Sequence, residues 1–76
     1  PFIAASDVRL KENINHVDTL PNGIKLYTWE WKEECKEPTF GVIAQEVAQV
    51  VPEAVITGKD GYLRVNYAHP ELKGVH

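Results

Sequence analysis

Methionine is absent from this 76-residue chain, and only one cysteine, Cys35, is present. A complete translation product normally begins with methionine, so we expect the chain to be a fragment or a processed piece of a longer protein. A single cysteine excludes a disulfide within the chain. A domain of this size buries only about 60% of its unfolded surface, so its core is marginal without a disulfide, a metal or oligomerisation. We therefore expect it to depend on oligomerisation or on a larger parent.

Long apolar runs and an excess of positive charge are missing as well. The formal net charge is −3, with acidic and basic residues well mixed along the chain, whereas nucleic-acid-binding domains usually carry a basic face. No segment approaches the roughly 20 apolar residues needed to cross a bilayer, and no signal peptide is visible. We expect neither a nucleic-acid partner nor a membrane partner.

Side chains with the spacing of metal ligands are not found either. His16, His69 and His76 form no i, i+4 pair and no cluster with cysteine, which are the patterns typical of zinc sites. Cys35 lies in a charged segment without a neighbouring histidine, and we interpret it as a surface thiol. No glycine-rich phosphate-binding loop is present. The sequence predicts no metal and no cofactor.

Alternating patterns predict a three- to four-stranded antiparallel sheet. Tyr27, Trp29 and Trp31 alternate with polar residues across 24–32, which is typical of a half-buried strand whose aromatic side chains share one face. Two further strands, 54–57 and 62–67, are joined by a glycine-containing hairpin turn. A short strand is expected over 40–43. We interpret the aromatic face as core.

Two helices complete the predicted α+β fold. Apolar residues at helical spacing predict a central amphipathic helix over 44–51, which Pro52 ends. Ser6 and Asp7 are good N-caps and predict a short helix over 7–14. We expect residues 1–5 to form an extended arm, 6–67 the domain and 68–76 a loosely ordered tail.

Ser6 and Lys11 are the residues with the clearest catalytic chemistry. A serine becomes a nucleophile when a base removes its proton, and a lysine can serve if its amine is neutral. Lysine has a pKa near 10.4 in water, and burial lowers it. If Lys11 is exposed in the monomer and covered by a neighbouring subunit, assembly would switch it on. From the spacing alone, the better interpretation is that Ser6 and Asp7 cap a helix and that Arg9 and Lys11 lie on its solvated face.

Three sequence blocks favour the catalytic interpretation instead: SDVRLKENI at 6–14, GVIAQEV at 41–47 and DGYLRVNY at 60–67. In this order they resemble the C-terminal intramolecular chaperone domain of phage endosialidases and tail fibres, a self-cleaving serine peptidase family. The module in myelin regulatory factor is similar. The resemblance covers roughly residues 6–67. It implies that Ser6 is the nucleophile, Lys11 the general base and Ala5–Ser6 the scissile bond, with Glu12 and Asn13 as candidate supporting residues.

The resemblance also implies a biological setting. The chain would promote trimeric assembly of a phage tail fibre or spike and then release itself by a single turnover. Its partners would be two copies of itself, with the upstream fibre of the same polypeptide as substrate, in a virion assembled in the bacterial cytoplasm. Ser6 would attack either the Ala5 carbonyl directly, with acyl shift to oxygen, or a bond across the trimer. Family members continue into a long helix, which Pro70 blocks here.

Three other functions remain open from the sequence. The chain is alternatively a non-cleaving trimerisation or tip module, or a self-cleaving module of a membrane-tethered transcription factor. A glycan-binding tip would use Tyr27, Trp29 and Trp31 as a stacking platform. Glu46 invites interpretation as a catalytic carboxylate, but a charge on the exposed side of an amphipathic helix is the simpler explanation.

Overall fold

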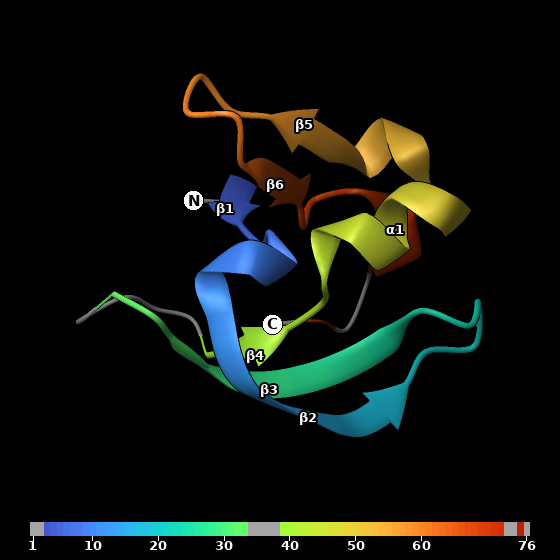
Figure 1. Cartoon of the computed structure of the whole chain (residues 1–76). Coiled ribbons are helices and arrows are strands. Elements are labelled where there is room, and N and C mark those ends of the chain that lie inside the picture. Colours follow the sequence, from blue (N-terminus) through green and yellow to red (C-terminus); the bar gives the residue numbers. More distant parts are fainter. Residues whose placement is uncertain (1–2, 34–38, 73–74, 76) are drawn as a thin grey trace.

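Two three-stranded antiparallel sheets form the fold, and the chain crosses from one to the other soon after its first strand (Figure 1). The structure is a computed structural model that describes residues 3–33, 39–72 and 75. Cys35 and His76 lie outside these residues. The first sheet has the order β1-β6-β5, from Ile3–Ala5, Leu63–Asn66 and Val55–Thr57, and the second has the order β2-β3-β4, from Lys11–Thr19, Lys25–Trp31 and Phe40–Gly41.

The helical elements are short; η1, α1 and η2 lie in the connections between the sheets, and η3 follows β6. The α-helix α1 spans Ala44–Val50, and three 3-10 helices, η1, η2 and η3, span Val8–Leu10, Pro52–Ala54 and Pro70–Leu72. Figure 1 shows α1 between β5 and β6 above it and β3 below it. Among the described residues, no helix is long and apolar enough to cross a membrane. The small α+β class is thus confirmed, although the strands form two sheets rather than one.

Several predicted elements match the structure. The alternating segment is β3, the central amphipathic helix is α1, and the glycine-rich turn joins β5 to β6 as a hairpin. Gly61 has φ +84° in that turn and Gly23 has φ +92° in the turn before β3, conformations that glycine adopts without steric cost. The buried apolar face of α1 is narrower than the apolar pattern over 44–51 predicts, because Val47 is buried whereas Val50 is 48% exposed.

The predicted helix over 7–14 is wrong. Asp7 does cap a helical turn by accepting a hydrogen bond from the Arg9 amide, but η1 ends at Leu10 and Lys11 is already extended, with φ −116° and ψ 148°. From Lys11 onward the chain pairs with β3. Asparagine, aspartate, valine and threonine dominate the segment that follows and are poor helix formers. Pairing with β3 therefore replaces the helix that the Asp7 cap led us to expect.

The core has two parts that differ in composition. The larger part, which we call the aliphatic cluster, contains buried Ile24, Leu26, Val42, Ala44, Val47, Val51, Ala54, Val65, Leu72 and Val75. The smaller part, the aromatic cluster, contains buried Tyr27, Trp29 and Ile43, with Val8, Ile14 and Trp31 packed against it. Tyr27 and Trp29 share one face of β3, as their spacing predicts.

Described residues near each end of the chain, Ile3–Ala5 and Leu72 with Val75, are built into the fold. Ile3–Ala5, in the expected N-terminal arm, form β1 and pair with Asn66, Val65 and Arg64 of β6. In the C-terminal tail, Leu72 is 0% exposed and Val75 is 3% exposed, and both belong to the aliphatic cluster. The prediction of a loose tail is therefore wrong for these residues, because two isolated apolar side chains without periodicity still reach the core.

Candidate active site at the junction of the two sheets

Ser6 directly follows β1 and is held by backbone hydrogen bonds on both sides. Its amide donates to the Leu63 carbonyl at 3.1 Å, and its carbonyl accepts from the Ala44 amide at 2.9 Å. The side chain is 0% exposed. These bonds fix the serine between β6 of the first sheet and the start of α1, so its hydroxyl position is set by the fold.

Lys11 opens β2 in the other sheet, and its amine meets the serine hydroxyl. Lys11 Nζ lies 3.0 Å from Ser6 Oγ and donates to the Val42 carbonyl at 2.6 Å. Ser6 Oγ donates to the same carbonyl at 2.5 Å. The short turn η1 brings the two residues together although they lie on different sheets. The pair singled out in the sequence is thus within hydrogen-bonding distance in a single chain.

Lys11 is already buried without any neighbouring subunit. The residue is 3% exposed, and Nζ lies 3.5 Å from the centre of the Trp29 ring and 5.7 Å from that of Trp31. Burial lowers the pKa of the Lys11 amine to about 7, although the nearby Asp7 and Glu46 charges act in the opposite direction. A substantial fraction of the amine is therefore neutral near pH 7. The expectation that Lys11 is exposed until a subunit covers it is wrong.

Asp7 ties the junction together, a role that its assignment as a helix cap did not include. Its carboxylate accepts from the Arg9 amide at 2.9 Å and from the Arg9 guanidinium at 3.0 and 2.8 Å. It also accepts from the Leu63 amide at 2.9 Å. The Arg9 hydrogen bonds, supported by the Leu63 amide, hold the pKa of the buried Asp7 carboxyl well below its usual range. Asp7 therefore joins η1 to β6 beside Ser6.

The 41–47 block forms one wall of the site. The Val42 carbonyl accepts from both members of the pair, and the Ala44 amide fixes the Ser6 backbone. Gln45 Oε1 accepts from the Val8 amide at 2.9 Å and so anchors η1. Apart from the family resemblance, nothing in the sequence indicated that these residues belong to the site. Any residue type can supply a backbone carbonyl that accepts hydrogen bonds, so such a group cannot be recognised from the sequence.

Glu12 and Asn13 lie beyond the site, at the exposed start of β2. Asn13 has φ +51° at an irregularity in the β2–β3 pairing, and its side-chain nitrogen Nδ2 donates to Glu30 Oε1 at 2.7 Å. Glu12 is exposed and opposes Glu30 in register. Side chains of neighbouring strand residues point to opposite faces, so Glu12 points away from the face of Lys11. A supporting role for these two residues stays a prediction.

Glu46 and the aromatic residues have structural contacts. The Glu46 carboxylate accepts from the Tyr27 hydroxyl at 2.8 and 3.0 Å. Burial, together with this carboxylate, raises the pKa of Tyr27 to about 12. Tyr27 is 9% and Trp29 4% exposed, and the Trp29 and Trp31 rings meet edge to face at 5.5 Å. Two of the three rings are therefore not available as an exposed glycan platform.

The carbonyl of the expected scissile bond points away from the first sheet. In a trans peptide unit the C=O and the N–H point in opposite directions. The Ser6 N–H points to Leu63 of β6, so the Ala5 C=O points away from β6. Because β1 lies at the end of the order β1-β6-β5, this carbonyl is directed to the outer edge of the sheet, where no strand of the described part of the chain pairs with it.

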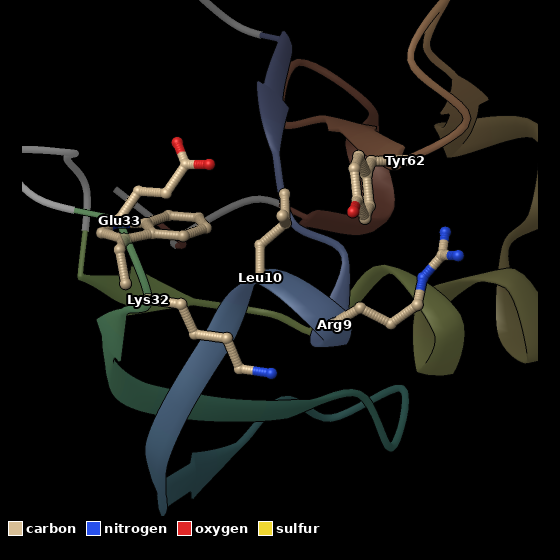
Figure 2. Close-up of a pocket in the computed structure, with 6 residues that line it drawn as sticks. Arg9, Leu10, Lys32, Glu33 and Tyr62 are labelled. Carbon is tan, nitrogen blue, oxygen red and sulfur yellow. The ribbon is translucent and has the colours of Figure 1, made fainter.

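A pocket of about 180 Å³ lies on the outer side of the turn that connects the pair. It is lined by Arg9, Leu10, Trp31, Lys32, Glu33 and Tyr62. Figure 2 shows Lys32 and Glu33 on one side, Arg9 and Tyr62 on the other, and Leu10 between them. Arg9 stacks over the Tyr62 ring at 4.8 Å. Ser6 and Lys11 are not among the lining residues, so this pocket does not give access to them.

The described residues contain no cluster of side chains suited to binding a metal ion. Across 3–33, 39–72 and 75, no group of three or more histidine, cysteine, aspartate or glutamate residues could hold a metal ion. His69 instead accepts from the Glu71 amide through Nδ1 and has Nε2 at 3.6 Å from Glu53. The polar groups closest to Ser6 Oγ include the Lys11 amine and the Val42 carbonyl.

Comparison with known proteins identifies a family for this chain. A family model described as chaperone of endosialidase, which carries a peptidase name, matches residues 6–56. No curated protein and no solved structure matches. The matched range begins at Ser6 and includes Lys11, Val42 and α1, so it contains most of the junction described above.

Proposed function

The chain belongs to the family of endosialidase chaperones, and from this premise we propose that it is an intramolecular chaperone that releases itself by cleaving its own Ala5–Ser6 bond. The observation that carries the proposal is the buried contact of 3.0 Å between Lys11 Nζ and Ser6 Oγ. A nucleophile within hydrogen-bonding distance of a base is the arrangement that nucleophilic catalysis requires.

Ser6 and Lys11 each have a role in the proposed reaction. Neutral Lys11 takes the proton from Ser6 Oγ, and the oxygen bonds to the Ala5 carbonyl carbon. The bond from that carbon to the Ser6 nitrogen breaks, and Lys11 returns its proton to the nitrogen. The resulting ester between Ala5 and Ser6 Oγ is hydrolysed by water, which leaves an Ala5 carboxylate and a chain that begins at Ser6. Each chain performs one turnover.

We propose that attack occurs within one chain. Ser6 and Lys11 meet in a single chain, and the Ala5 carbonyl is not held by β6. Mixing a wild-type chain with a tagged Ser6→Ala chain tests this point. Attack within the chain leaves the tagged chain intact in mixed oligomers, whereas cleavage of the tagged chain after Ala5 would show attack across subunits.

The proposed partners are two further copies of the chain and the upstream fibre or spike of the same polypeptide. Large apolar side chains remain exposed and could be covered in a trimer; they are Ile3, Val17, Phe40, Val50 and Ile56. Joining three chains at one end reduces the entropic cost of aligning distant β-rich segments. Removal of the chaperone after folding would then make the folded fibre kinetically stable.

The test is the intact mass of a longer chain that extends upstream of Pro1, beside its Ser6→Ala and Lys11→Ala variants. We expect a product that begins at Ser6 from the parent and full-length mass from both variants. Lys25→Ala, at an exposed position on β3, is the matched control and should cleave as the parent does. Full-length mass in every folded, trimeric sample would instead identify a non-cleaving assembly module.

A further inference from the structure

Tyr67 directly follows β6, and its side chain approaches Ser6. Its hydroxyl oxygen lies 3.5 Å from Ser6 Oγ and 3.4 Å from the Val42 amide nitrogen, which donates to it. The ring packs against the aliphatic cluster. Tyr67 is thus a further side chain whose polar group lies close to Ser6 Oγ, beside Lys11.

The hydrogen-bond directions leave the phenolic proton available to the serine. The Val42 amide donates a hydrogen bond to the Tyr67 phenol oxygen. The Tyr67 O–H is thus free to donate to another acceptor, and Ser6 Oγ is within its reach. A distance of 3.5 Å is long for an O–H donor. Catalytic hydrogen bonds are often long before reaction and shorten when charge develops on the acceptor.

Gly41 provides the space for this hydroxyl. A Cβ atom at position 41 would lie 2.5 Å from the Tyr67 hydroxyl oxygen and 3.3 Å from Trp29 Cη2. The first distance is far shorter than any van der Waals contact, so a larger residue would displace the phenol. The glycine of the 41–47 block therefore has a specific neighbour in the 60–67 block.

We propose that Tyr67 is a further catalytic residue that donates a hydrogen bond to Ser6 Oγ while Lys11 removes the serine proton, and that Gly41 leaves the space that the Tyr67 hydroxyl occupies. The inference rests on the proposed self-cleavage and adds a group to the same site. The proton passes from Ser6 Oγ to Lys11 Nζ, whereas Tyr67 keeps its own proton and stabilises the negative charge that develops on Oγ.

The test is the cleavage rate of the longer chain as a function of pH, for the parent and for Tyr67→Phe. We expect the maximal rate of Tyr67→Phe to fall about tenfold, the size of one neutral hydrogen bond, while the pH midpoint stays where the parent has it. An unchanged maximal rate would overturn the inference. A shifted midpoint with an unchanged maximum would also overturn it, because Tyr67 would then act only by packing around Lys11.

Gly41→Ala supplies an independent check in two backgrounds. The strain at φ +156° and the contact with Trp29 are common to both backgrounds, whereas the closest clash is with the Tyr67 hydroxyl. We therefore expect Gly41→Ala to slow cleavage, or to prevent folding, much more in the parent than in Tyr67→Phe. An equal effect in both backgrounds would contradict the assignment of Gly41. If the parent itself remains uncleaved, the proposed function fails and this inference fails with it; if the parent cleaves and Tyr67→Phe cleaves equally fast, only the inference fails.

Discussion

The two sheets hold the two side chains of the proposed catalytic pair by different means. Ser6, at the end of β1, is fixed by backbone hydrogen bonds to Leu63 and Ala44, beside the aliphatic cluster. Lys11, at the start of β2, is desolvated under Trp29 of the aromatic cluster. A nucleophile needs an accurate position, whereas a lysine base needs surroundings that remove its charge. The fold supplies the position from one sheet and the surroundings from the other.

The largest expected effect concerns the aromatic side of this comparison. The pKa of Lys11 is about 7 in the folded chain, whereas an unperturbed lysine side chain has a pKa of 10.5. Between pH 7 and pH 10.5 the unfolded chain therefore binds more protons than the folded chain. The free energy of unfolding should therefore rise with pH across this window, by up to roughly 1.4 kcal/mol per pH unit. Urea unfolding at several pH values measures the slope.

Lys11→Met provides the control for that slope. Methionine has a similar length and no charge, so the rise between pH 7 and 10 should disappear in this variant. A slope that persists in Lys11→Met would show that other groups produce it, and the aromatic cluster would then not be responsible for a neutral lysine.

The aliphatic side is tested by Leu72→Ala. Leu72 is fully buried in the aliphatic cluster, and truncation of a buried leucine costs about 3 kcal/mol through lost burial and a cavity. Val50→Ala, at a residue that is 48% exposed, is the matched control and should cost less than about 1 kcal/mol. Equal losses in thermal unfolding would contradict the assignment of the C-terminal tail to the core.

Asp7→Ala tests the connection between the two sheets. The change removes the acceptor of the Leu63 amide and of Arg9 and the cap of η1, so we expect a loss of about 2 kcal/mol. Because the folded pKa of Asp7 is depressed, its contribution is present above the ordinary aspartate range and is lost as the pH falls below it. Denaturation of both proteins at pH 7 and pH 2 should thus show a smaller difference at pH 2.

Glu53→Ala serves as the control for Asp7→Ala, since the Glu53 side chain is 68% exposed. We expect its stability to remain within about 0.5 kcal/mol of the parent. If both variants lose equal stability, the Asp7 carboxylate does not hold the junction together.

The smallest expected effect is that of Tyr27→Phe. It removes the hydroxyl that donates to Glu46 but keeps the ring in the aromatic cluster, so we expect a loss of about 1 kcal/mol in chemical unfolding. Cleavage should continue at the parental rate, because this hydroxyl does not contact Ser6 or Lys11. A large loss of cleavage with little change in stability would give Glu46 the catalytic role that its structural contact argues against.

The fold was predictable where one pattern dominated. The alternation of Tyr27, Trp29 and Trp31 predicts β3, and the glycines around 58–61 predict the β5–β6 hairpin. The segment that became β2 begins with good helix formers, and its conformation is decided by pairing with β3. The burial of Leu72 similarly depends on distant residues. Long-range contacts of this kind leave no local periodicity.

For the site, the sequence and its resemblance identified Ser6 and Lys11 but not the groups around them. The Val42 carbonyl has no side-chain signature, and the proximity of Tyr67 to Ser6 spans 61 positions of sequence. The depressed pKa of Lys11 depends on Trp29, which the alternation identified as core without indicating its neighbour.

The most direct measurement is an NMR titration of the Lys11 amine in the folded single chain, with ¹⁵N- and ¹³C-labelled lysine and the other lysines as internal references. A midpoint at about pH 7 is expected from burial beside Trp29, and it would show that one chain alone carries a lysine able to act as a base. A midpoint near the ordinary value of 10.5 would contradict this and would require another subunit to activate Lys11.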